Sequence, residues 1–141
     1  MSNNYSNLKR LVMRQNKVKV DGAKELSSAG YLKNLEELDL RQCKLDDDGI
    51  THLMKSHSLL KNIISLDLGD NNITNNGVEI IAKNAHLQNL TRLYLSWNKI
   101  QDNGLLHLAS SNFIKKILVL DLSYNNITHE GIVYLIESEV F

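Results

Sequence analysis

Apolar residues, one asparagine or cysteine, and one glycine recur along the chain in a fixed pattern. It can be written L-x-x-L-x-L-x-x-N/C-x-L-x-x-x-G, where L stands for any apolar residue. A further apolar residue lies three positions before each copy. Self-similarity at a fixed period is the signature of a repeat architecture, so one repeat domain is expected over residues 1–141. The five copies start 27 or 28 residues apart, at Leu8, Leu35, Ile63, Leu90 and Ile117.

The first part of each copy has the pattern of a β-strand with one buried face. In Leu38, Asp39 and Leu40, for example, apolar and polar residues alternate. A single repeat cannot bury its own apolar face, so the five strands are expected to pair in parallel within one sheet. The expected strands cover residues 10–13, 37–40, 65–68, 92–95 and 119–122.

After the glycine the apolar spacing becomes that of a helix. Gly104 is followed by apolar residues at offsets of one, four and five, which share one helical face. Thr74, Thr128 and Asp46 lie three residues before their glycines and are expected to cap helices. Acidic residues near the first turns fit the positive end of the helix dipole. They are Asp47, Asp48, Asp102 and Glu130.

Asparagine recurs where the strand gives way to a loop, at Asn16, Asn71, Asn98 and Asn125. Its amide can hydrogen-bond the backbone groups that leave the sheet. A row of amides could also bind a ligand, but a role as internal scaffold is the favoured interpretation. Cys43 takes this position in the second copy. We expect it to be a buried small residue rather than a nucleophile or a metal ligand.

The repeat resembles the leucine-rich-repeat family, and the resemblance extends from Tyr5 to the end of the chain. The period and the trailing glycine are similar to the ribonuclease-inhibitor-like subclass, which is typically intracellular. The resemblance implies an α/β solenoid, a curved right-handed horseshoe segment of about five repeats. Its parallel sheet would line the concave face and its helices the convex face. It also implies a protein-interaction module in the cytoplasm, or in a host cytoplasm if the protein is a bacterial effector.

Composition and motifs narrow the function. The formal net charge is zero, which argues against nucleic acid and an anionic membrane as partners. A single cysteine excludes an intrachain disulfide and favours a reducing compartment. The N-terminus lacks the apolar core of a signal peptide, and no apolar run is long enough to span a bilayer. The glycines form no phosphate-binding motif and the histidines no metal-ligand spacing. We therefore expect no enzyme activity, metal or cofactor.

Residues between the leucines of a strand point away from the core and are the candidate binding residues. Acidic and aromatic side chains gather there although core packing needs neither. Carboxylates on adjacent strands repel one another, and tryptophan, tyrosine and arginine dominate interface hot spots. The expected partner is a protein or peptide with a basic segment. The candidate residues are Asp39, Arg41, Asp67, Asp70, Arg92, Tyr94, Trp97, Asp121 and Tyr124.

Three alternatives stay open. Some proteins with this repeat activate small GTPases through an exposed arginine, but no arginine here can be assigned that role. Short domains of similar length bind actin-filament ends, which is an analogy of fold alone. The third alternative concerns the C-terminus, because solenoids need polar caps and no dedicated cap follows the fifth helix, which ends near Glu137 to Phe141. Either the chain is part of a longer protein, or its exposed end pairs with another copy.

Overall fold

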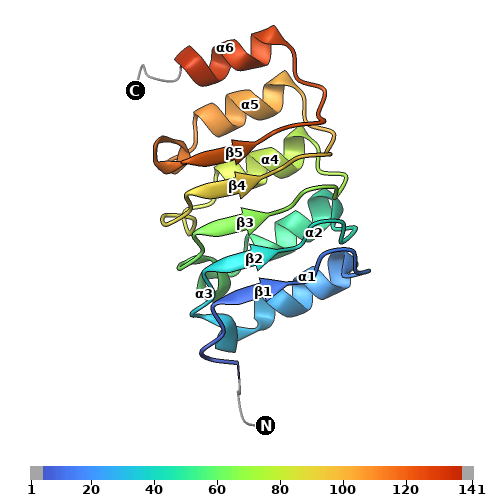
Figure 1. Cartoon of the computed structure of the whole chain (residues 1–141), viewed down its shortest axis with the longest axis vertical. Coiled ribbons are helices and arrows are strands. Elements are labelled where there is room, and N and C mark those ends of the chain that lie inside the picture. The colour runs from blue at the N-terminus through green and yellow to red at the C-terminus, as the bar shows by residue number, and fades with distance from the viewer. Residues whose placement is uncertain (1–4, 138–141) are drawn as a thin grey trace.

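The computed structural model describes residues 5–137, and within them five strands form one sheet (Figure 1). The strands follow one another in chain order, and every neighbouring pair is parallel. The α/β solenoid expected from the repeat is therefore confirmed. The strands are β1 (Arg10–Val12), β2 (Glu37–Asp39), β3 (Ser65–Asp67), β4 (Arg92–Tyr94) and β5 (Val119–Asp121).

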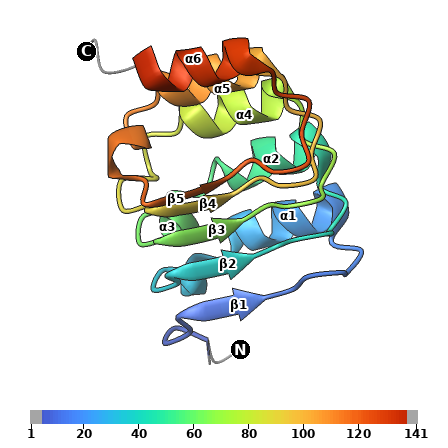
Figure 2. The ribbon, with the colours of Figure 1, turned by 45° about the horizontal axis from the view of Figure 1, so that its top comes forward.

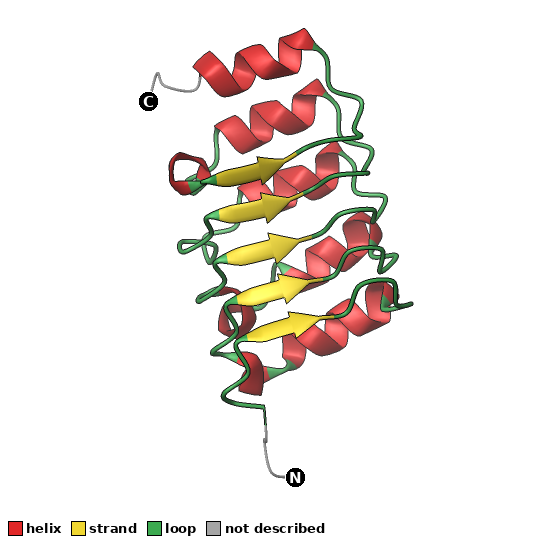
Figure 3. Cartoon of the chain, viewed as in Figure 1, coloured by secondary structure: helices red, strands yellow, loops and turns green. Residues whose placement is uncertain are grey.

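Helices cover one side of the sheet. In the view of Figure 3 the strands lie in front of the helices, and the turned view of Figure 2 shows the two as separate layers, so that one face of the sheet has no helix over it. We call this uncovered side the concave face. The helices are α1 (Lys19–Ser28), α2 (Asp46–Leu53), α3 (His57–Leu60), α4 (Asn75–Ala82), α5 (Asp102–Ala109) and α6 (His129–Glu137), with the 3-10 helices η1 (Gly30–Leu32) and η2 (Ile114–Lys116).

Each strand ends one residue earlier than expected. The next residue still bonds the neighbouring strand, as Met13 does when its N–H donates to the carbonyl of Asp39 at 2.8 Å. Two residues further on, the backbone becomes left-handed, with φ between 52° and 62°. This conformation turns the chain out of the sheet. The five residues that adopt it are Gln15, Gln42, Asp70, Trp97 and Tyr124.

The leucine anchors form one core between the two layers. Leu40, Leu68 and Leu95 are fully buried. Met13 and Leu122 hold the same position in the first and fifth repeats and are only partly buried. The difference arises because an end repeat has a neighbour on one side only. The alternation read from the sequence therefore identified the core, and the stacking set how deeply each repeat is buried.

The asparagine row is an internal scaffold, as expected. Asn98 is buried, and its Oδ1 accepts the N–H groups of Asn71 and Ile73 in the preceding repeat at 3.0 and 2.9 Å. Its Nδ2 donates to the carbonyls of Leu68, Leu95 and Ser96. Cys43 is fully buried at the same position, and burial raises the pKa of its thiol. Its structural role is thereby supported.

A second asparagine row, which the sequence analysis missed, joins the repeats at the other ends of the strands. Asn34, Asn62 and Asn89 each precede the first leucine position of a repeat, and each donates its Nδ2 to a carbonyl of the repeat before, at 2.7–2.8 Å. In the fifth repeat Lys116 takes this position, and its Nζ donates to the carbonyl of Gln88 at 3.1 Å. The 27–28 residue period alone could have revealed this row.

Two of the three expected helix caps are present. The hydroxyls of Thr74 and Thr128 accept the N–H two residues on, at 3.2 and 3.3 Å. The expectation for Asp46 is wrong. Asp46 is the first residue of α2, and Leu45 at the cap position makes no side-chain bond.

The caps are instead tied together between repeats. Asp47 lies in the first turn of α2, and its carboxylate accepts the N–H and the hydroxyl of Thr74 at 2.9 and 2.6 Å. The same carboxylate occupies the space that a Cβ on Gly77 would need. Asp102 stands in the same relation to Gly131. These glycines therefore make room for the carboxylate of the preceding repeat, and their φ angles are ordinary.

Candidate binding face

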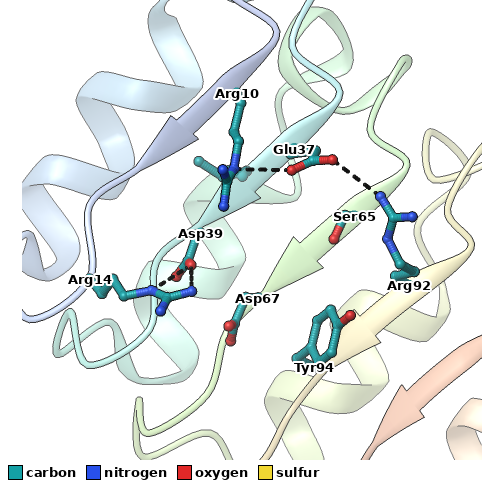
Figure 4. A pocket seen from close by; sticks show the side chains of 9 residues that line it. Arg10, Arg14, Glu37, Asp39, Ser65, Asp67, Arg92 and Tyr94 are labelled. Atoms are coloured by element: carbon teal, nitrogen blue, oxygen red, sulfur yellow. Dashed lines mark hydrogen bonds and ion pairs between the residues drawn. The ribbon is translucent and has the colours of Figure 1, made fainter.

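Two columns of side chains cross the concave face because the parallel strands are in register. One column runs through Arg10, Glu37, Ser65, Arg92 and Val119. The other runs through Val12, Asp39, Asp67, Tyr94 and Asp121. A hollow of about 600 Å³ lies over their central part. This concave hollow is lined by Arg10, Arg14, Glu37, Leu38, Asp39, Ser65, Asp67, Arg92 and Tyr94 (Figure 4).

Arginines of this chain neutralise two carboxylates of the concave hollow. Glu37 accepts from Arg10 at 3.1 Å and from Arg92 at 3.2 Å. Arg92 reaches it across the short side chain of Ser65, which leaves the path open (Figure 4). Arg14 donates to Asp39 through its Nε at 2.7 Å and through a second nitrogen. Arg10, Arg14 and Glu37 were not among the candidate residues, although they lie beside them.

Arg41 spans two strands in a similar way, outside the lining of the hollow. Its guanidinium donates to the hydroxyl of Ser96 at 3.3 Å. Gly69 lies between them, and a Cβ there would be 3.2–3.3 Å from both groups. The absent side chain at Gly69 therefore leaves the space through which the guanidinium of Arg41 reaches Ser96.

Asp67 is the exception among the carboxylates of the concave hollow. It lies between Asp39 and Tyr94 (Figure 4). Its Oδ1 accepts the N–H of Gly69 at 2.9 Å, and among the described residues it forms no ion pair. Burial raises the pKa of Asp67; the N–H of Gly69 opposes this shift, the charge of Asp39 adds to it, and the more distant charges of Arg41 and Arg14 oppose it. Asp67 is thus a partly desolvated carboxylate that forms no ion pair of its own among the described residues.

The aspartates of the concave face also stabilise the fold, because they accept hydrogen bonds from backbone N–H groups. The expectation that the fold does not need these carboxylates is therefore wrong. Asp39 is only 8% exposed, and its Oδ1 accepts the N–H of Arg41 at 3.2 Å. Asp121 accepts both the N–H and the hydroxyl of Ser123, and these hydrogen bonds hold the pKa of Asp121 below its usual range. Like Asp67, each of them closes the turn that follows its own strand.

The aromatic residues divide between two places. Tyr94 lines the concave hollow. Trp97 and Tyr124 lie at the left-handed turns where the strands end, and we call this row of turn residues the rim. Their rings stack at 4.2 Å with planes 16° apart, yet 52% of Trp97 and 69% of Tyr124 remain exposed. The rim also contains Asp70, which accepts from Gln42 at 2.6 Å.

The candidate residues therefore form no single cluster. Asp39, Asp67, Arg92 and Tyr94 come together in the concave hollow. Among the residues that the structure describes, no group of three or more histidine, cysteine, aspartate or glutamate side chains could hold a metal ion. No helix in the described part of the chain is long and apolar enough to cross a bilayer.

Comparison with known proteins identifies a matching family and finds likenesses to solved structures. The family described as "Leucine Rich repeat" matches residues 31–54, 60–82, 86–109 and 114–135. No curated protein matches the chain. A solved structure titled "Crystal structure of a TDR receptor" is similar at 20% identity with a TM-score of 0.36. The alignment covers 90% of this chain but only 29% of that one. Because the family matches extend over most of its length, this chain belongs to the leucine-rich-repeat family.

Proposed function

We propose that the protein binds a partner protein or peptide on its concave face, and that the partner presents a basic segment. Leucine-rich repeats generally mediate protein–protein interaction, which supports the coarser part of this proposal. The concave face is the side of the sheet without helices (Figure 2). It is about 19 Å across, from four strand spacings, and suits a peptide or a helix better than a broad rigid surface.

The observation that carries the proposal is the unpaired carboxylate of Asp67. Arginines of the chain already neutralise its neighbours Glu37 and Asp39. A guest ammonium or guanidinium group in the concave hollow would give Asp67 the cation that it lacks and lower its raised pKa. The adjacent ring of Tyr94 could take the same cation on its face.

The rim provides an apolar anchor beside this charge. Trp97 and Tyr124 keep more than half of their surface exposed although they stack on each other. Both hold a left-handed backbone conformation that is costly for a residue with a large side chain. Asparagine or glycine would adopt this turn more cheaply. We infer that these rings are retained for contact with the partner.

The proposal is tested by capturing partners and then measuring affinity. Partners retained by the wild-type protein but lost by the double variant Trp97→Ala, Tyr94→Ala are taken forward. Trp97→Ala alone is expected to weaken binding by about 2 kcal/mol or more without changing thermal stability. Asp67→Asn should weaken it as well, whereas Asp48→Asn on α2 serves as the matched control. Binding that survives both Trp97→Ala and Asp67→Asn, or that maps to the helices, would refute the proposal.

The salt dependence tests the charge of the partner separately. Attraction between Asp67 and a basic segment is screened as ionic strength rises, so the association rate should fall. The comparison uses a captured partner, wild-type protein and Asp67→Asn at low and high salt. A rate for the wild type that is independent of salt would exclude a basic partner while leaving a neutral one.

We further propose that the chain is a non-enzymatic, cytoplasmic protein of the ribonuclease-inhibitor-like subclass. The 27–28 residue period supports the subclass. The buried, unpaired thiol of Cys43 fits a reducing compartment. Fractionation of cells that express the protein, with detection in the soluble and secreted fractions, tests the location.

Association between copies is a second candidate, and the fifth repeat favours it. Leu118 is 82% exposed and Ile136 is 68% exposed, and both belong to the fifth repeat. A second copy that covers these two side chains would remove both from water. Sedimentation at increasing concentration should then show dimers in the wild type and fewer in Leu118→Lys. A monomer at all concentrations would exclude this candidate.

A further inference from the structure

Two histidines that lie far apart in the sequence meet on the outside of the solenoid. His57 is the first residue of α3, and His86 lies in the loop between α4 and β4. The Nδ1 atoms of the two rings are 3.1 Å apart. The two residues are separated by 29 positions, about one repeat, so that stacking of adjacent repeats brings them together. The concave face and its proposed partner make no use of this pair.

The backbone around both rings is held in place. Ser56 caps α3, and its hydroxyl accepts the N–H of Leu59 at 3.3 Å. Asn84 joins the two segments. Its Nδ2 donates to the carbonyl of Met54 at 2.6 Å, and its Oδ1 accepts the N–H of His86 at 2.8 Å. The two imidazoles therefore face each other from backbone that is already fixed, which lowers the entropic cost of binding something between them.

The ring geometry is not that of a straight hydrogen bond. With a straight N–H···N bond of this length, the ring centroids would lie about 5.4 Å apart. Two imidazoles that bind one ion through these nitrogens, at about 2.0–2.1 Å each, would hold their centroids about 4.8 Å apart. The observed centroid distance is 4.7 Å, with the ring planes 74° apart. The observed distance is therefore closer to that of two rings bound to one ion than to that of a straight hydrogen bond.

We propose that His57 and His86 bind one divalent transition-metal ion through their Nδ1 atoms. Imidazole nitrogen suits Cu²⁺, Ni²⁺ and Zn²⁺, and Cu²⁺ binds most tightly in this series. Coordination needs both Nδ1 atoms free of protons. The proton shared between them moves to the Nε2 of the ring that carried it, so both rings remain neutral. Mg²⁺ and Ca²⁺ prefer oxygen ligands and are not bound.

The ion would keep open coordination positions. No third histidine, cysteine or carboxylate joins the pair within residues 5–137. A structural zinc site has four protein ligands, so the pair does not contribute a site of that kind. Water fills the remaining positions, and a donor atom of another molecule can replace it there.

The test titrates Zn²⁺ and, separately, Cu²⁺ into the untagged full-length protein. With Zn²⁺, the ring nitrogen signals of His57 and His86 should shift in NMR spectra and saturate at one ion per chain. Calorimetry should show binding at least tenfold weaker in His57→Ala and in His86→Ala. Asn84→Ala should also weaken binding, since it loosens the pair without removing a ligand. His57→Gln should lose binding as His57→Ala does.

The matched control is His107→Ala. The Nε2 of His107 lies 3.9 Å from a carboxylate oxygen of Glu79. His107 is thus another histidine with a potential metal-binding group beside it. Binding that is unchanged in His107→Ala but lost in the His57 and His86 variants supports the proposal. Equal loss in all three, or affinity in either pair variant within threefold of the wild type, overturns it. The unfolding midpoints of the metal-free variants are compared with that of the wild type. A midpoint close to the wild-type value shows that a variant that no longer binds the ion is still folded.

Discussion

At the residue scale, a single buried amide joins backbone groups that otherwise have no partner. Asn98 accepts two N–H groups from the preceding repeat and donates to three carbonyls. Side-chain amides are suited to this because they donate and accept at once. The sequence placed this asparagine correctly at the end of the strand. Its contacts across repeats explain why asparagine returns at four of the five turns.

Replacing Asn98 by alanine should lower the free energy of unfolding by about 2–3 kcal/mol, because several buried backbone groups would be left unpaired. Asn16→Ala is the control, since Asn16 lies at the same repeat position in the first repeat but is exposed. Its replacement should cost far less. Urea unfolding of both variants gives the comparison, and equal losses would contradict the buried-ladder explanation.

Gly77 is required for its small size and not for an unusual backbone conformation, since its φ angle is ordinary. A Cβ at this position would meet the carboxylate of Asp47 and lie 2.7 Å from Ile73 Cγ2. Helix propensity alone favours alanine over glycine by about 1 kcal/mol, whereas overpacking costs about 1–3 kcal/mol. We therefore expect Gly77→Ala to lower the melting temperature.

Gly30→Ala is the matched control for this change. A Cβ on Gly30 would meet no atom within 4 Å. The variant should consequently melt close to the wild type. A Gly77→Ala protein that melts higher than the wild type would show that the neighbouring repeat can move away.

At the element scale, the starts of α4, α5 and α6 are each connected to the helix of the preceding repeat. Asp102 in α5 accepts the N–H and the hydroxyl of Thr128, the cap of α6, at 2.8 and 2.7 Å. These hydrogen bonds, first of all that from the backbone of Thr128, hold the pKa of Asp102 below its usual range. These N-cap residues therefore do more than begin a helix. Their hydrogen bonds to the preceding repeat also fix how one helix stacks on the next.

This contact predicts a pH dependence of stability. The pKa of Asp102 is lower in the folded chain, so its contribution is present above the unfolded value of about 4. The contribution is lost as the pH falls through the folded value. The melting temperatures of wild type and Asp102→Asn should therefore differ most near neutral pH and converge in acid.

Asp67→Asn should show the opposite trend and serves as the comparison. Burial raises the pKa of Asp67 in the folded chain, so its favourable contribution exists at low pH and is lost as the pH rises through the folded value. The wild type should thus lose stability relative to Asp67→Asn on going from acid to neutral pH. Identical trends for the two variants would contradict the assigned environments.

At the scale of the whole molecule, stability should vary along the solenoid. A repeat protein is stabilised mainly by contacts between neighbouring repeats. Leu66 and Leu93 in the middle of the sheet are fully buried, while Leu120 in β5 is only partly buried. The fifth repeat is therefore expected to open more readily than the third and fourth.

Hydrogen exchange measures this gradient directly. Amides in β3 and β4 should exchange by global unfolding, and those around β5 should exchange faster by local opening. A partner that binds to the concave face should slow the exchange of the amides in the strands that it covers. Uniform protection from β1 to β5 at all protein concentrations would show that the ends are stabilised as well as the centre.

The repeat, the five parallel strands, the buried leucines and the asparagine turn could all be predicted from the sequence alone. All four features depend on which side chains are buried in each repeat. The buried positions recur every 27–28 residues, so they can be recognised along the sequence. It also indicated that acidic and aromatic side chains share the concave face. The second asparagine row was present in the same period and could have been found with it.

The contacts between side chains of different repeats became visible only in the folded chain. The left-handed turns moved Trp97 and Tyr124 from the sheet to the rim. Arg92 reaches Glu37, which is 55 positions away, because the strand between them carries a short side chain. His57 and His86 became neighbours through the stacking of adjacent repeats. Such contacts depend on side-chain length, turn conformation and repeat offset together, and a pattern of apolar positions records none of these.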